Sequence, residues 1–221
     1  MKNKQLQILL NDFELLSKTT LLQLQIVTKL LQDNKIDALI AEAEQNEIII
    51  DRLEVKIREE IVFAIFQFTP KAADLRKIIT YQDITSNLER VGDMLLNIIH
   101  FLKDMELKDK DFSEIAKMID KMLGYVSEML RNAIFSFGNE DPNVAYEIIK
   151  EDDKVDQLFW KIKISLQQTF ANKQLSEEKI QNIINFDSIS HNLERIGDSA
   201  TNIAEATIYL TEGKDIRHGN K

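Results

Sequence analysis

The chain has 221 residues, of which 44% are hydrophobic, and it carries a formal net charge of −9 at pH 7 with no cysteine. The absence of cysteine excludes disulfides, thiol chemistry and cysteine-bound zinc. The negative charge disfavours nucleic acid or an anionic membrane surface as a main partner, because both attract basic patches. Few glycines and prolines among many Leu, Ile, Glu, Lys and Gln residues are typical of an all-helical protein.

Breaker and capping residues divide the chain into six long helices. We expect breaks at residues 33–34, 69–70, 108–111, 138–142 and 172–176. Thr69 as N-cap and Pro70 at the first helical position predict the start of the third helix. Ser176, followed by two glutamates, predicts the start of the sixth.

The apolar stretch at 61–68 is far shorter than the roughly 20 residues that span a bilayer. It therefore predicts a buried helix. The N-terminus meets acidic residues before any long apolar region, so it does not resemble a secretory signal. We expect a cytoplasmic protein with no membrane insertion.

The two halves of the chain repeat one pattern at a constant step of 105 residues. The phrase Leu-Glu-Arg-Val-Gly-Asp at 88–93 recurs as Leu-Glu-Arg-Ile-Gly-Asp at 193–198. This period exceeds that of solenoid repeats. The sequence therefore predicts two tandem three-helix bundles with a pseudo-two-fold internal repeat, the first at 1–108 and the second at 109–221.

The two helices that contain the Leu-Glu-Arg phrases each carry a glycine, Gly92 or Gly197, on the apolar seam that faces the neighbouring helices. Glycine inside a helix is about 1 kcal/mol less favourable than alanine. Close approach of a neighbouring helix explains why a seam position lacks a side chain in both copies.

Paired acids also repeat at this step. Each Leu-Glu-Arg phrase places a Glu and an Asp at i and i+4, where like charges on one helix face repel by a few tenths of a kcal/mol. Folding each half into a hairpin about residue 70 or 175 brings an earlier acid pair level with this one. Four carboxylates then meet in each half: Glu47, Asp51, Glu89 and Asp93 in the first, and Asp152, Asp156, Glu194 and Asp198 in the second.

The helical wheel places these acids on the bundle surface, with Asn97 and Asn202 as possible additional ligands. Such an all-oxygen set suits hard cations, namely Mg²⁺, Mn²⁺, Ca²⁺ or iron. A charged outward stripe is also what an ordinary surface helix presents. A bound cation and a solvated face therefore both remain open.

The positions of the histidines do not support an enzymatic function. A di-iron carboxylate oxidase uses Glu-x-x-His pairs on two helices, and the chain has none. His100, His191 and His218 do not fit the repeated pattern, and no catalytic triad or glycine-rich phosphate loop can be assembled.

The chain resembles the PhoU family, the regulators of bacterial phosphate uptake. The resemblance rests on the two Leu-Glu-Arg phrases, on the earlier acid pairs, on residues 70–76 and on the ending at 209–218. It implies two three-helix bundles whose eight repeated acids bind iron or zinc clusters. It also implies a non-enzymatic adaptor between the ATPase of the phosphate ABC transporter and a sensor histidine kinase. We further expect a homodimer.

Two departures leave open whether both halves bind metal alike. Asp152 stands where the first half has Glu47, and the segment that begins at Pro70 has no counterpart in the second half. Two rival hypotheses also remain. One is a hydrolase or oxidase that uses a carboxylate-bound metal pair, and the other is a structural helical dimer without metal function.

Overall fold

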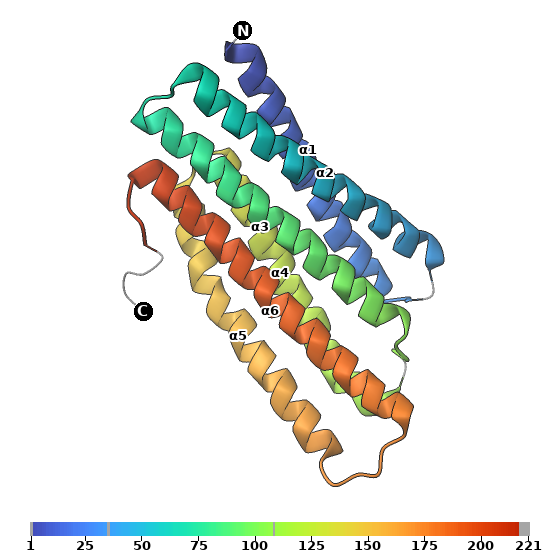
Figure 1. The fold of residues 1–221 in the computed structure, drawn as a ribbon. Coiled ribbons are helices and arrows are strands. Elements are labelled where there is room, and N and C mark those ends of the chain that lie inside the picture. The colour runs from blue at the N-terminus through green and yellow to red at the C-terminus, as the bar shows by residue number, and fades with distance from the viewer. Residues whose placement is uncertain (1, 35, 108, 217–221) are drawn as a thin grey trace.

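Runs of strong helix formers produce six long helices in the computed structural model, which describes residues 2–34, 36–107 and 109–216 (Figure 1). The all-α fold is confirmed, and the described residues contain no strand. None of the described helices is long and apolar enough to cross a membrane. The helices are α1 (Lys2–Leu30), α2 (Asp37–Phe68), α3 (Ala72–Lys103), α4 (Ser113–Gly138), α5 (Pro142–Phe170) and α6 (Glu177–Glu212), and a short 3₁₀ helix, η1 (Lys110–Phe112), precedes α4.

Side-chain caps set the starts of α5 and α6. The Asp141 carboxylate accepts hydrogen bonds from the amides of Asn143 at 2.9 Å and Val144 at 3.4 Å, with Pro142 as the first helical residue. The Ser176 hydroxyl accepts one from the Lys179 amide at 3.3 Å, which confirms the predicted start of α6. These bonds satisfy amides that the helix itself leaves without partners.

The predicted start of α3 is wrong by two residues. Thr69 does not cap α3. It ends α2 instead, in a left-handed conformation with φ 39° and ψ 63°, and its amide donates to the Ile65 carbonyl at 3.2 Å. The chain then passes through Pro70 and an extended Lys71 before α3 begins at Ala72. Because Thr69 terminates the preceding helix, its hydroxyl is not placed to cap the next one.

The prediction that residues 61–68 form a buried helix is wrong in its burial. The segment is the helical end of α2, but Val62, Phe63 and Phe66 are 62%, 46% and 85% exposed. The apolar run gives no periodicity that would show which side faces the core.

The helices form two three-helix bundles, α1–α3 and α4–α6, as predicted from the repeat. Figure 1 shows α3 and α6 side by side at the centre, with α2 and α5 on the outer sides and α1 and α4 behind. The core is continuous across the halves. The rings of Phe13, Tyr81 and Phe137, from α1, α3 and α4, pack with centroids 4.8 to 5.3 Å apart. The boundary between 108 and 109 stays a prediction, since residue 108 lies outside the described residues.

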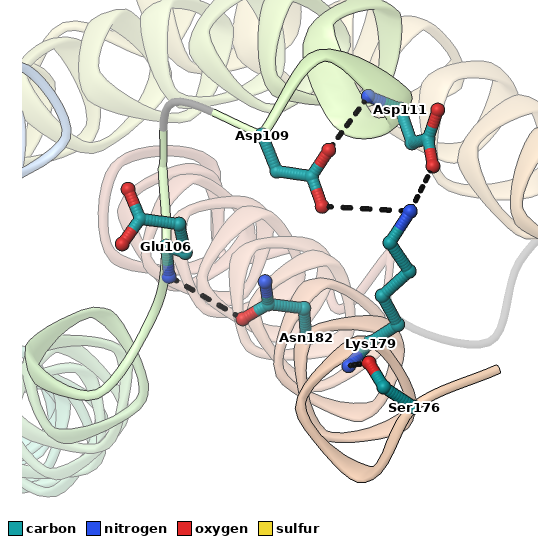
Figure 2. Close-up of polar contacts among 6 residues, drawn as sticks. All are labelled: Glu106, Asp109, Asp111, Ser176, Lys179 and Asn182. Carbon is teal, nitrogen blue, oxygen red and sulfur yellow. Dashed lines mark hydrogen bonds and ion pairs between the residues drawn. The ribbon is translucent and has the colours of Figure 1, made fainter.

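Polar side chains anchor the segment that joins the halves. The Asn34 amide donates to the carbonyls of Leu102 at 2.6 Å and Met105 at 2.7 Å. Figure 2 shows the α6 side of this segment, where Asn182 accepts a hydrogen bond from the Glu106 amide and Lys179 pairs with Asp109 and Asp111. The connection is therefore held against both bundles.

The glycines on the seam mark the closest approach of neighbouring helices, as predicted. A Cβ on Gly92 would lie 3.0 Å from Ile50 Cδ1 and 3.2 Å from Glu47 Oε2, both on α2. A Cβ on Gly197 would lie 3.3 Å from Val155 Cγ1 and 3.7 Å from an oxygen of Asp152, on α5. The first approach is the tighter of the two.

This difference makes the two glycines a matched pair for mutation. Alanine gains about 1 kcal/mol of helix propensity at either position. We expect Gly92→Ala to lower the free energy of unfolding by about 1–2 kcal/mol, because the new methyl group overpacks against the buried Ile50 and Glu47. Gly197→Ala should leave it unchanged or slightly higher. Urea unfolding of both variants measures this, and equal destabilisation would contradict the packing argument.

Candidate metal centre

The structure brings the four predicted acids of the first half together across α2 and α3. Glu47 and Asp51 lie one turn apart on α2, and Glu89 and Asp93 lie one turn apart on α3. The charges of Asp93, Asp51 and Glu89 all act on the Glu47 carboxyl. Folding about residue 70 therefore produces the juxtaposition that the spacing predicted.

Glu47 is the deepest member of this group. Its side chain is 8% exposed, and neither carboxylate oxygen has a hydrogen-bond partner among the described residues. Burial, the contact with the Asp93 carboxyl and the negative charges of Asp93, Asp51 and Glu89 together raise the pKa of Glu47 from 4.5 to about 8, with burial the largest cause. A buried carboxylate without a donor is unfavourable unless it is protonated or meets a cation.

The predicted surface position holds for part of the group only. Asp51 and Asp93 are exposed and Glu89 is half-buried, whereas Glu47 lies in the interior. Because Gly92 has no side chain, α2 approaches α3 closely and the seam encloses the Glu47 carboxylate. The four acids therefore extend from the bundle surface to the interface between α2 and α3.

The second half repeats the arrangement in a shallower form. Asp152 is half-buried, and burial followed by the charges of Asp198 and Asp156 raises its pKa from 3.8 to about 6. Burial and the same two charges also raise the pKa of Glu194. Asp156 and Asp198 are exposed. All four predicted acids of this half therefore share one electrostatic environment.

The structure adds a fifth acid to the first centre. Glu54 is 9% exposed, forms an ion pair with Arg58, and its charge raises the pKa of Glu89. The sequence signal was present but overlooked, since Glu54 follows Glu47 by seven residues and Asp51 by three, which places it on the same side of α2.

The surroundings of the second centre are different. Phe159 occupies the position equivalent to Glu54, and its ring lies 6.0 Å from that of His191. Lys163 lies 4.9 Å above the Phe159 ring and pairs with Asp187 at 3.2 Å, and its charge lowers the pKa of Glu194. The first centre is therefore more acidic and more deeply buried than the second.

The described histidines, and the asparagines that the sequence offered as further ligands, lie at the edges of the two acidic centres or outside them. His191 Nδ1 is 3.6 Å from a Glu194 oxygen, and His100 Nε2 is 3.9 Å from Glu44. His218 lies outside the described residues. Asn97 and Asn202 are exposed, four residues after the last acid of each pair.

The acids gather without forming a finished coordination shell. In the described parts of the chain, no three Asp, Glu or His side chains are arranged closely enough to hold one ion. The donor chemistry nevertheless fits a hard cation, because each centre is built from carboxylate oxygens and the buried Glu47 oxygens lack donors. Rotation of exposed aspartates such as Asp51 would be needed to complete a shell.

Comparisons with known proteins identify the scaffold. A sequence model of the PhoU domain matches the chain twice, over residues 13–102 and 119–207, and these ranges contain all eight acids. A phosphate-specific transport system accessory protein PhoU homolog from Clostridium acetobutylicum is 32% identical over 169 residues, which are 76% of this chain and 75% of that protein. A homolog from Methanothermobacter thermautotrophicus is 30% identical over 213 residues, covering 94% and 92%. The crystal structure of PhoU from Pseudomonas aeruginosa has the same fold, with a TM-score of 0.88 at 24% identity over 97% of this chain and 100% of that one.

The raised pKa of Glu47 predicts how the stability of the metal-free protein depends on pH. Below its ordinary pKa of 4.5 the carboxyl is protonated in both the folded and the unfolded state. Between 4.5 and about 8 the folded state retains a proton that the unfolded state has lost, so stability falls as the pH rises. A neutral glutamine avoids this loss. In the presence of a chelator, Glu47→Gln should exceed the parent protein by on the order of 2 kcal/mol at pH 8.5 and match it near pH 5.

Urea unfolding across this pH range measures the difference. Glu42→Gln, which changes an exposed acid of the same helix, is the control and should keep the parent pH dependence. Parallel curves for Glu47→Gln and the parent protein would show that Glu47 does not bind its proton more strongly in the folded state.

Proposed function

The chain belongs to the PhoU family, and we propose that it regulates phosphate uptake and phosphate-starvation signalling as a cytoplasmic, non-enzymatic adaptor. The observation that carries this proposal is the duplicated acidic centre on a PhoU scaffold, with all eight acids inside the two matched domains. The relatives that match this chain over most of its length are named as accessory proteins of phosphate-specific transport. Those names support a regulatory role over the hydrolase or oxidase alternative.

We propose that each centre binds metal through its four repeated acids. In the first half these are Glu47, Asp51, Glu89 and Asp93, with Glu54 beside them, and in the second half Asp152, Asp156, Glu194 and Asp198. Iron, zinc, magnesium and manganese are the candidate ions. A bound cation would neutralise the clustered carboxylates and link α2 to α3 and α5 to α6. The unpaired, buried oxygens of Glu47 support this assignment.

The helices that carry the repeated acids would form the surface that contacts a protein partner. The central helices α3 and α6 carry the later acid pairs, and α2 and α5, which carry the earlier ones, flank them on the outer sides (Figure 1). With their carboxylates neutralised, these hairpins would present stiffened helix faces to a protein partner. We propose the ATPase subunit of a phosphate ABC transporter and a sensor histidine kinase as partners of a homodimer. The transport system named for the relatives supports the first of these.

A reporter of the phosphate-starvation response tests this role. In a strain that lacks its own PhoU-family gene, expression of the chain should restore repression in phosphate-rich medium. The quadruple variant Asp51→Ala/Asp93→Ala/Asp156→Ala/Asp198→Ala should lose repression, because both centres lose two of their four carboxylates. The control replaces four exposed acids outside the centres with alanine, namely Glu42, Glu59, Asp120 and Glu128, and should repress normally.

The outcomes separate the two parts of the proposal. Failure of the parent chain to repress would contradict the regulatory role itself. Full repression by the quadruple variant at parental protein levels would leave the adaptor role standing and remove the acidic centres from it.

A further inference from the structure

Glu54 continues the stripe of acids along α2. It follows Glu47 by seven residues and Asp51 by three, which places it about 10 Å and about 4.5 Å further along the helix axis. Seven residues make nearly two full turns, so Glu54 lies within about 20° of the direction of Glu47. Because side chains of a helix lean toward its N-terminus, the Glu54 carboxylate leans toward Asp51.

The hairpin geometry places Glu54 opposite α3. Folding about residue 70 sets it level with Ser86, at a third level beyond the two at which the repeated acids meet. In the second half the third level pairs Phe159 with His191, and their rings lie 6.0 Å apart across α5 and α6. In the first half the charge of Glu54 acts on Glu89 of α3. Both halves therefore build a third level, but only the first places a carboxylate there.

Glu54 is buried with a partner that can be released. The residue is 9% exposed, and its carboxylate pairs with Arg58 one turn later on α2. The Arg58 side chain is 55% exposed, so its guanidinium can move into water at little cost. A buried carboxylate is unfavourable without a counter-charge, and a bound cation supplies one in place of Arg58.

A second buried acid points to a cation at the same centre. Glu47 is 8% exposed, neither of its carboxylate oxygens has a hydrogen-bond partner among the described residues, and the charges of three other acids of the centre reach it. Its counterpart in the second half, Asp152, is only half-buried. The affinity of a site for hard cations depends on the number of charged oxygen ligands and on its rigidity. Both favour the first centre.

We propose that Glu54 is a fifth metal ligand of the first centre, beside Asp51 and Glu89, and that it makes this centre the tighter of the two for a hard divalent cation such as Mn²⁺. This assignment rests on the proposed binding of metal by both centres. Arg58 releases the Glu54 carboxylate to the ion and turns into solvent. The first centre is then filled at ion concentrations at which the second is still largely free, so the second centre alone responds to changes in metal supply.

Two full-length variants isolate the centres. Asp156→Ala/Asp198→Ala leaves the first centre intact, and Asp51→Ala/Asp93→Ala leaves the second. After removal of metal, Mn²⁺ is added at neutral pH and the free ion is measured by its electron paramagnetic resonance signal, while circular dichroism checks that each variant is folded. We expect the first centre to bind Mn²⁺ at least about tenfold more tightly than the second.

Exchange of the third-level residues between the halves tests the role of Glu54. In the variant that keeps only the first centre, Glu54→Gln, which preserves the size of the side chain, and Glu54→Phe, which copies the second half, should each weaken Mn²⁺ binding at least about tenfold. In the variant that keeps only the second centre, Phe159→Glu should strengthen it. Glu59→Gln changes an exposed acid of the same helix and is the matched control, which should alter the affinity by less than about twofold.

Arg58 separates a metal ligand from a merely structural ion pair. Because Arg58 competes with the ion for Glu54, Arg58→Gln should strengthen Mn²⁺ binding by the first centre, and this gain should disappear in the Glu54→Gln background. A general effect of removing a positive charge would persist in that background.

The proposal is overturned by equal Mn²⁺ affinities of the two centres, by an unchanged affinity in Glu54→Gln, or by a gain from Arg58→Gln that persists without Glu54. Absence of Mn²⁺ binding in the parent protein and in every variant would instead contradict metal binding by the acidic centres, and with it the role of Glu54.

Discussion

The burial of the Glu47 carboxylate depends on the close approach of α2 to α3 at a residue without a side chain. Gly92 lies on the α3 seam, and a methyl group there would meet both Ile50 and Glu47 of α2. The same contact that packs the first bundle therefore encloses an ionisable group whose oxygens have no hydrogen-bond donor among the described residues. Three further carboxylates surround it, so protonation or a cation is the way to relieve the repulsion. Packing and the chemistry of the candidate site are thus one constraint.

Comparison of the two halves separates the features that both copies share from those that only one copy has. Both halves keep the glycine on the seam and the acid pairs beside it, so these belong together. The halves differ around this common part. Glu54 and Arg58 flank the first centre, whereas Phe159 and Lys163 take the equivalent places beside the second. The first half therefore holds the more acidic centre, and its Glu47 is the more deeply buried acid.

Features that follow from periodicity were predictable from sequence alone. The six helices, the duplicated bundles, the packing role of Gly92 and the gathering of Glu47 with Asp93 follow from spacing and from the hairpin midpoint. Features that depend on how closely two helices approach were not predictable. The interior position of Glu47 is one of these, because a helical wheel gives direction but not depth. The role of Thr69 is another, since a residue between two helices can cap either one, and only the path of the chain decides.

The central claim is that the repeated acids bind metal, and the metal content of the protein tests it most directly. The protein should be purified without an affinity tag or chelator and compared by elemental analysis with Asp51→Ala/Asp93→Ala/Asp156→Ala/Asp198→Ala. We predict stoichiometric iron, zinc, magnesium or manganese in the parent protein and its loss in a variant that remains folded. Little metal in either protein, or equal metal in both, would contradict the account and return these acids to an ordinary solvated helix face.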